Sequence, residues 1–192
     1  DQSTVMEELG LQQDGFILVS AHREENIDIE ANFLSLMTAI NEMAEKYQMP
    51  VVYSTHPRSL DRITRRGFEL HPLVRSLEPF GFFDYNHLQM NAFCVLSDSG
   101  TLSEESAILG FNGVLIRTST ERPEVLDKGT VIIGGITAGD IGQAIELSRQ
   151  MRENGEPVVL APDYQDANVS VKVVKIIQSY TSIINKVTWD NR

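Results

Sequence analysis

The chain has 192 residues, 42% of them hydrophobic, which is enough for one well-buried domain. A formal net charge of -11 excludes a nucleic-acid-binding surface, because such a surface needs a basic patch that displaces counterions. The single cysteine excludes an internal disulfide, and the sequence has no apolar run of the roughly 20 residues that span a membrane. We therefore expect a cytoplasmic protein that binds neither nucleic acid nor a membrane. Four scattered histidines and one cysteine give no metal-ligand spacing, so neither a metal nor a cofactor is expected.

Short β-rich runs recur along the chain and alternate with helical patterns. The runs span residues 16–20, 51–55, 73–77, 93–97, 114–117 and 131–134. Apolar residues recur at helical spacing over 33–47 and 141–151, and a last long helix is expected over 169–183. Strands that alternate with helices predict an α/β fold, a doubly wound (Rossmann-like) parallel sheet covered on both faces. We expect one domain over 1–192 whose last helix packs elsewhere, and the polar start without Met indicates a piece of a longer protein.

The strand order predicts where a ligand binds. If six strands take the common order 3-2-1-4-5-6, the chain reverses between the first and the fourth, and ligands bind beyond the carboxyl ends of these two strands. The first strand leads into residues 20–26, SAHREEN, and the fourth leads into residues 97–105, SDSGTLSEE. Two polar segments far apart in the sequence thus converge at the expected crevice, which favours a ligand site.

The segment 97–105 joins an apolar run to the start of a helix. Unpaired N–H groups at a helix start attract phosphate, Gly100 lets a phosphate approach, and Ser99 and Thr101 can donate hydrogen bonds to it. Glu105 can reach past the phosphates to the paired hydroxyls of a ribose. The alternative is an ordinary N-cap with a glutamate in the first turn, the capping box found on many helices.

Other candidates follow neighbouring strands, and each has a structural alternative. His22 and Arg23 can contact a diphosphate, and His22 can assist proton transfer, but both can also merely solvate a loop. Arg122 follows the fifth strand and can bind a phosphate bidentately, or it can pair with a glutamate on either side of it. Tyr85 can flank a base, although an aromatic residue beside a helix start is more often part of the core. His56, which follows the second strand, fits either interpretation.

Four motifs occur in order: SAHREEN at 20–26, STHP at 54–57, SDSGTLSEESA at 97–107 and RTSTERPE at 117–124. In this order and at these intervals they resemble the non-hydrolysing UDP-N-acetylglucosamine 2-epimerase family, over essentially the whole chain. The resemblance implies the C-terminal, UDP-binding half of a two-domain enzyme of the glycosyltransferase B type. It also implies an N-terminal domain that is absent from this chain and a homodimer as the full-length protein.

The resemblance implies a role for each site residue. The phosphates of a UDP-sugar substrate lie near His22 and Ser99, the ribose at Glu105 and the uracil near Tyr85. Loss of the C2 proton and of UDP gives a glycal, and readdition on the other face gives the epimer. His22 is the catalytic candidate here, while the groups that move the C2 proton belong, in the family, to the absent half. The implied UDP-binding set is His22, Arg23, Tyr85, Ser99, Gly100, Thr101, Glu105 and Arg122.

Three departures from the family pattern resemble a subgroup. They are Gly100-Thr101 for two glycines, Thr118 for an aspartate and Pro57-Arg58-Ser59 for Pro-Asn-Pro. This subgroup makes UDP-N-acetyl-L-fucosamine for capsule or O-antigen by inverting C2 of UDP-2-acetamido-2,6-dideoxy-L-talose. UDP-N-acetylglucosamine, which would give UDP-N-acetylmannosamine, stays an alternative substrate, as do a nucleotide-sugar glycosyltransferase domain and a non-catalytic interaction domain as alternative classes. A dehydrogenase is disfavoured, because the turn after the first strand has no glycine.

Overall fold

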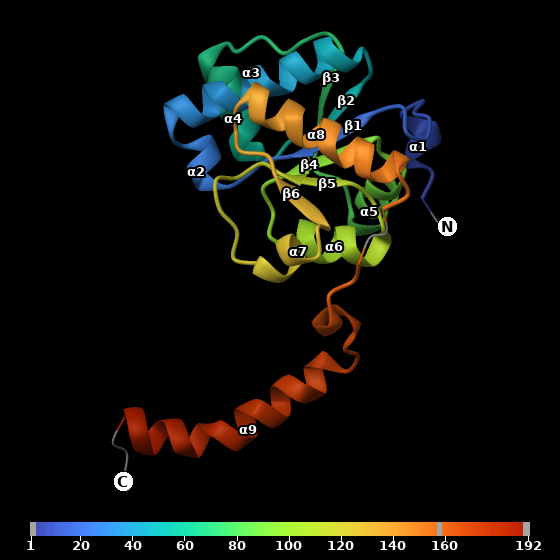
Figure 1. The fold of residues 1–192 in the computed structure, drawn as a ribbon. Coiled ribbons are helices and arrows are strands. Elements are labelled where there is room, and N and C mark those ends of the chain that lie inside the picture. Colours follow the sequence, from blue (N-terminus) through green and yellow to red (C-terminus); the bar gives the residue numbers. More distant parts are fainter. Residues whose placement is uncertain (1–2, 157–158, 190–192) are drawn as a thin grey trace. The chain divides into compact units, whose positions relative to one another are not determined.

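The computed structural model describes residues 3–156 and 159–189 (Figure 1). The chain divides into two compact units, Asp1–Leu160 and Ala161–Arg192. The first unit contains a β-sheet with its covering helices. The second contains one short 3-10 helix and one long α-helix.

A six-stranded sheet forms the centre of the first unit, and every neighbouring pair of strands is parallel. The strands are β1 (Ile17–Ser20), β2 (Val51–Ser54), β3 (Val74–Leu77), β4 (Cys94–Ser97), β5 (Gly113–Leu115) and β6 (Val131–Ile133). Their order, β3-β2-β1-β4-β5-β6, confirms the predicted doubly wound topology. Every residue of β2 and β4 is buried, as expected for parallel strands covered on both faces.

The end of one strand differs from the sequence prediction. The fifth β-rich run predicts a strand up to Arg117, but β5 ends at Leu115. The backbone N–H of Arg117 donates to the Leu115 carbonyl at 3.0 Å, which closes a tight turn and takes Arg117 out of the strand. The Arg117 side chain therefore leaves the sheet at its carboxyl edge.

Helices cover both faces of the sheet (Figure 1). The core on one face is formed by α3 (Glu30–Tyr47) and α8 (Ala138–Glu153), with buried residues such as Phe33, Met37 and Ile141 packed against the strands. These helices confirm the two amphipathic patterns of the sequence. The other helices of this unit are α1 (Val5–Glu8), α2 (Glu24–Ile27), α4 (Pro57–Arg66), α5 (Phe82–Asn91), α6 (Leu102–Leu109) and α7 (Pro123–Asp127).

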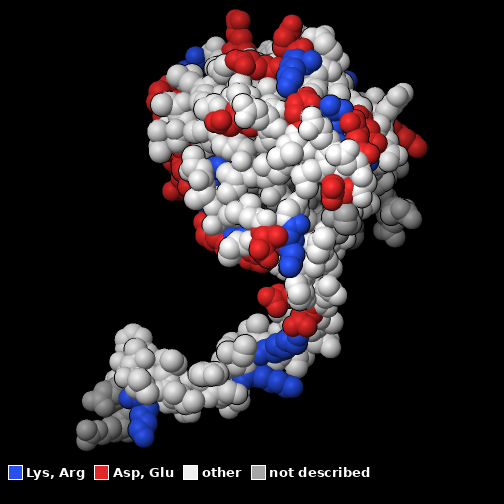
Figure 2. All heavy atoms as spheres, viewed as in Figure 1, with Lys and Arg blue, Asp and Glu red and all other residues white. Residues whose placement is uncertain are grey.

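Acidic side chains are spread over the face of the first unit that Figure 2 shows, with the basic side chains isolated among them. This distribution agrees with the net charge of -11. Any site for an anion in this unit therefore depends on local donors rather than on the charge of the whole surface.

The second unit consists of the 3-10 helix η1 (Pro162–Gln165) and α9 (Val169–Thr188). The predicted last helix is therefore confirmed. Its apolar residues are exposed, including Ile176 (58% exposed), Tyr180 (56%) and Ile183 (50%). Among the residues that the structure describes, no helix combines the length and the apolar character needed to cross a membrane.

Candidate functional site

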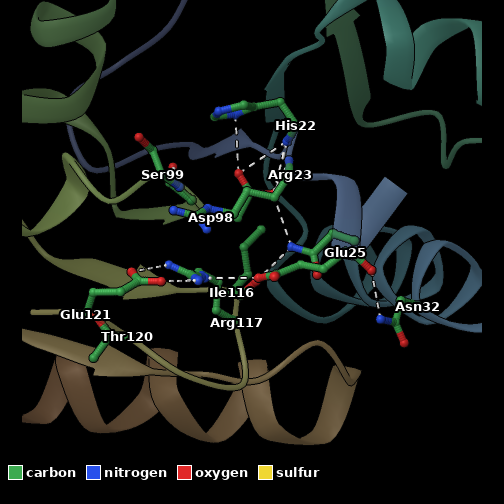
Figure 3. A network of polar contacts seen from close by, with 12 residues as sticks. His22, Arg23, Glu25, Asn32, Asp98, Ser99, Ile116, Arg117, Thr120 and Glu121 are labelled. Carbon is green, nitrogen blue, oxygen red and sulfur yellow. Dashed lines mark hydrogen bonds and ion pairs between the residues drawn. The ribbon is translucent and has the colours of Figure 1, made fainter. Parts of the chain in front are cut away.

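The loops after β1 and β4 meet at a buried carboxylate. Asp98 directly follows β4 and is 0% exposed. Its carboxylate accepts hydrogen bonds from the backbone N–H groups of His22 at 3.0 Å and Arg23 at 2.9 Å (Figure 3). The buried side-chain amide of Asn26 donates a third, at 3.0 Å. Because a buried carboxylate requires such donors, Asp98 holds the loop after β1 against the end of β4. The two polar segments thus converge as predicted.

The His22 side chain lies at the solvent-facing edge of this junction. Its Nδ1 atom is 3.3 Å from Asp98 Oδ1, and the side chain is 45% exposed. The contact with Asp98 directs Nδ1 to the protein and leaves Nε2 as the ring nitrogen for a ligand. The ring centroid of His56 is 6.2 Å away. His56 accepts a hydrogen bond from the backbone N–H of Arg58 and caps α4, which gives it a structural role.

The turn at 99–101 leads directly into α6. The hydroxyls of Ser99 and Thr101 are 3.0 Å apart, and the Ser99 N–H donates to the Ser97 hydroxyl. Thr101 occupies the N-cap position, but its side chain makes no capping hydrogen bond. The two glutamates also bond elsewhere: Glu104 accepts from Arg122, and Glu105 accepts from Gln89. The capping-box alternative is therefore wrong for this helix. Its first N–H groups, those of Leu102 and Ser103, donate instead to the carbonyls of Ser99 and Gly100, each at 3.3 Å.

Arg122 lies beside this turn. A Cβ atom placed on Gly100 would be 3.8 Å from Arg122 Nη2, so the guanidinium borders the one position without a side chain. Arg122 Nε donates to Glu104 Oε1 at 2.7 Å. Glu121, one of the two glutamates that the sequence offers as alternative partners of Arg122, bonds to Arg117 instead. The fold thus brings a cation and a turn with room at Gly100 together, which suits an anion.

Tyr85, near the start of α5, is partly buried. Burial raises its pKa to about 12, the charge of Glu105 adds to the rise, and hydrogen bonds with the Ser20 and Ser97 side chains oppose it. Since Ser20 ends β1 and Ser97 ends β4, the phenol lies at the carboxyl edge of the sheet. The fold therefore brings Tyr85 to the site, while its contact with a base stays a prediction.

Glu105 occupies the first turn of α6 and is held from α5. Gln89 Nε2 donates to Glu105 Oε2 at 2.7 Å, and the Gln89 side chain is fully buried. The negative charge of Glu105 also contributes to the raised pKa of Tyr85. Glu105 is therefore present at the predicted edge, and its contact with a ribose stays a prediction.

Sequence reasoning missed a buried arginine next to the site. Arg117 is 3% exposed and donates to Glu25, on α2, and twice to Glu121 (Figure 3). Its hydrogen bonds lower the pKa of Glu121 to about 2, and the charge of Arg23 has a smaller effect in the same direction. The signal was an arginine inside an apolar run at a strand end. Asp98, Asn26 and Gln89 were also missed as supporting residues.

A surface groove elsewhere on the molecule contains none of the predicted site residues. It runs between α3 and α8 and is lined by residues that include Met43, Lys46, Gly142 and Glu146. These residues lie on helices that cover one face, not at the carboxyl ends of β1 and β4. The chemistry of this unit is concentrated at those strand ends.

Comparison with known proteins identifies the family. A family model described as UDP-N-acetylglucosamine 2-epimerase matches residues 1–178. The chain belongs to the UDP-N-acetylglucosamine 2-epimerase family. It is 32% identical to a Methanococcus maripaludis UDP-N-acetylglucosamine 2-epimerase over 139 residues, which are 70% of this chain and 38% of that protein. The predicted family is thereby confirmed.

Relatives within this family act on different sugars. A Pseudomonas aeruginosa UDP-2,3-diacetamido-2,3-dideoxy-D-glucuronate 2-epimerase is 32% identical over 146 residues, 75% of this chain and 40% of that protein. The structure of UDP-N-acetylglucosamine 2-epimerase from Rickettsia bellii matches with a TM-score of 0.79 and 34% identity, over 99% of this chain and 51% of that one. The chain thus spans about half of that structure, as the predicted half of a glycosyltransferase B type fold does.

Proposed function

We propose that this chain binds the UDP part of a UDP-N-acetyl amino sugar whose C2 centre the complete enzyme inverts. The observation that carries the proposal is the convergence of His22, the 99–101 turn and Glu105 at the ends of β1 and β4. Doubly wound sheets bind nucleotides where the strand order reverses. The names of the two relatives, both epimerases of UDP-sugars, support the same ligand class.

Each part of UDP has a partner in this proposal. The diphosphate lies against the 99–101 turn, where the exposed hydroxyls of Ser99 and Thr101 donate to it. His22, Arg23 and Arg122 surround it. Glu105 accepts hydrogen bonds from the ribose hydroxyls, and Tyr85 lies beside the uracil. Support for this arrangement comes from the Arg122 guanidinium beside Gly100 and from the outward-facing ring of His22.

The proposed chemistry is an elimination and a readdition. A base removes the C2 proton of the sugar, the C1–O bond breaks, and UDP leaves with the bonding electron pair to give a glycal. UDP then adds back at C1, while a proton returns to the other face of C2. His22, Arg122 and the N–H groups of the turn stabilise the charge of the departing UDP. His22 is the catalytic residue of this chain in the proposal, because it touches the leaving group.

A second domain is part of the proposal. The chain spans 38% and 40% of the two relatives, which leaves room in such a protein for the groups that move the C2 proton. We propose that this chain is the C-terminal UDP-binding domain, that it binds UDP without turnover by itself, and that the full-length enzyme is a cytoplasmic homodimer. The exposed apolar side chains of α9 would pack against the other domain.

The proposed substrate is UDP-2-acetamido-2,6-dideoxy-L-talose, and the product is UDP-N-acetyl-L-fucosamine for capsule or O-antigen synthesis. The support is the departure of the motifs from the family pattern, with Thr101 after Gly100 and Thr118 before the Arg122 segment. UDP-N-acetylglucosamine is the second candidate, favoured by the name of the Methanococcus relative. The Pseudomonas relative supports a family in which the sugar varies.

Calorimetric titration of the 192-residue chain tests the nucleotide site. We expect weak but selective binding of UDP, because the base, ribose and diphosphate all have partners here. NAD should give no binding heat, since the turn after β1 has no glycine to accept a dinucleotide. Equal binding of UDP and NAD, or of neither, contradicts the proposal.

Deuterium exchange in the full-length enzyme tests the reaction and the sugar. Turnover in deuterated water should place deuterium at C2 of UDP-2-acetamido-2,6-dideoxy-L-talose and its epimer, with some free UDP released. If deuterium entered UDP-N-acetylglucosamine instead, that sugar nucleotide would be the substrate, and the proposed reaction would stay the same. No deuterium in either sugar, together with sugar transfer to an acceptor, would show a glycosyltransferase.

A further inference from the structure

Gln89 is a fully buried polar side chain for which the proposed UDP contacts give no role. It lies on α5 next to Leu88, and both side chains are 0% exposed. A buried amide is unfavourable unless its donors and acceptor are hydrogen-bonded. An apolar side chain of similar volume would fill this position of α5 without that cost, so the amide calls for an explanation.

The hydrogen bonding of Gln89 is one-sided. Its Nε2 donates to Glu105 Oε2 at 2.7 Å. This orientation of the amide is fixed by chemistry, because a carboxylate accepts and only the NH₂ end of glutamine can donate to it. The Oε1 atom is buried and has no hydrogen-bond partner in the part of the chain that the structure describes. The benefit of Gln89 therefore lies in its contact with Glu105.

That contact fixes a carboxylate at the edge of the site. Glu105 contributes to the raised pKa of Tyr85, whose hydroxyl bonds with the side chains of Ser20 and Ser97 at the ends of β1 and β4. Gln89 holds Oε2 of Glu105 from the α5 side, which leaves Oε1 and the remaining lone pair of Oε2 as acceptors. Two acceptor positions on one fixed carboxylate suit two neighbouring hydroxyl donors.

We propose that Gln89 is a positioning residue that holds the Glu105 carboxylate in the orientation in which it accepts the two ribose hydroxyls of the nucleotide. The inference rests on the proposed UDP site and deepens it. It gives the site a means of preferring a ribonucleotide, because a fixed acceptor binds hydroxyl donors at a lower entropic cost than a mobile one. A ligand without those hydroxyls gains nothing from Gln89.

The test compares two ligands on one substitution. Gln89→Met keeps the approximate volume of the side chain and removes its amide. In the 192-residue chain we expect roughly tenfold weaker calorimetric binding of UDP and unchanged binding of 2′,3′-dideoxy-UDP, which lacks both hydroxyls. Urea unfolding should change little, since the variant removes an unpartnered buried acceptor and one hydrogen bond to a carboxylate, whose effects on stability oppose each other. Leu88→Met, at the neighbouring buried position, should change neither affinity.

The same substitution in the Glu105→Gln variant distinguishes an effect of Gln89 through Glu105 from a general effect on packing. If Gln89 acts through the carboxylate, adding Gln89→Met to Glu105→Gln should weaken UDP no further. The inference would be overturned if Gln89→Met weakened UDP binding by a further full amount in the Glu105→Gln background. It would also be overturned if the Gln89→Met variant alone lost equal affinity for UDP and for 2′,3′-dideoxy-UDP, or if it unfolded. Failure of the wild-type chain to bind UDP would overturn the proposed function together with the inference. Wild-type binding of UDP that Gln89→Met leaves unchanged would overturn the inference alone.

Discussion

The two sides of the candidate site are held in different ways. On the β1–β4 side, the carboxylate of Asp98 is 0% exposed and binds backbone N–H groups of the loop that carries His22. On the β5 side, Arg122 pairs with Glu104, and these side chains are 36% and 31% exposed. Buried, fully bonded groups have one geometry, whereas a half-exposed ion pair contributes little and exchanges partners easily. We therefore expect a rigid wall at His22 and an adaptable one at Arg122.

The largest effect is expected from Asp98→Ala. The substitution leaves the N–H groups of His22 and Arg23 without their acceptor. It also removes one of the two acceptors of the Asn26 amide, which keeps the Ile116 carbonyl. Each buried donor left without an acceptor costs about 1 to 3 kcal/mol, and urea unfolding of the variant should show the sum of these losses. Asp61→Ala is the control, because the ion pair of Asp61 with Arg65 on α4 has side chains that are 50% and 76% exposed and should contribute less than about 1 kcal/mol. Equal losses in the two variants would remove the distinction between a rigid and an adaptable wall.

The next effect concerns ligand selectivity on the rigid side. Glu105→Gln should weaken UDP by about 1.5 to 3 kcal/mol, the range for hydrogen bonds to a charged acceptor, and leave pyrophosphate binding unchanged. His22→Ala should weaken both ligands, since its ring faces the diphosphate in the proposed site. Calorimetric titrations of both ligands measure the two patterns. If Glu105→Gln lowers the affinity for UDP and pyrophosphate equally, Glu105 has a structural role in α6 and does not bind the ribose.

The sequence predicts the frame of this site better than its supports. Apolar runs and helical spacing predict all six strands, because these patterns are local in the sequence. The common strand order of doubly wound sheets then brings the loops after β1 and β4 together. Asp98 bonds to residues 76 and 75 positions away, and Gln89 bonds to Glu105, 16 positions away. Such contacts depend on tertiary packing that no local pattern encodes. The capping-box alternative failed for the same reason, since both glutamates found partners on other elements.

A smaller effect is expected on the adaptable side. Glu104→Gln removes the charge that competes with a phosphate for Arg122, so UDP should bind about two- to threefold more tightly, while Arg122→Ala should weaken it. Titrations at low and high salt measure both changes. The gain should fall as salt screens the half-exposed charges. A loss of UDP affinity in Glu104→Gln would mean that Glu104 aligns Arg122, and the β5 side would then be as rigid as the β1 side.

The smallest effect concerns the pH dependence of stability at Arg117. Hydrogen bonds from Arg117 lower the pKa of Glu121 from 4.5 to about 2. Because the pKa is lower in the folded chain, this ion pair stabilises the fold above pH 4.5 and loses its contribution as the pH falls towards 2. Glu121→Gln should therefore flatten the fall of the urea midpoint between these pH values, by a small amount because Glu121 is 58% exposed.

Glu42→Gln on α3 is the matched control, since it removes the same charge from an exposed position that does not bond to Arg117. Its urea midpoint should follow that of the wild-type chain across the same pH range. An unchanged profile in Glu121→Gln would show that Glu25 alone satisfies the buried guanidinium. Arg117 would then be anchored entirely to α2, and the rigid wall of the site would extend from Asp98 to the end of β5.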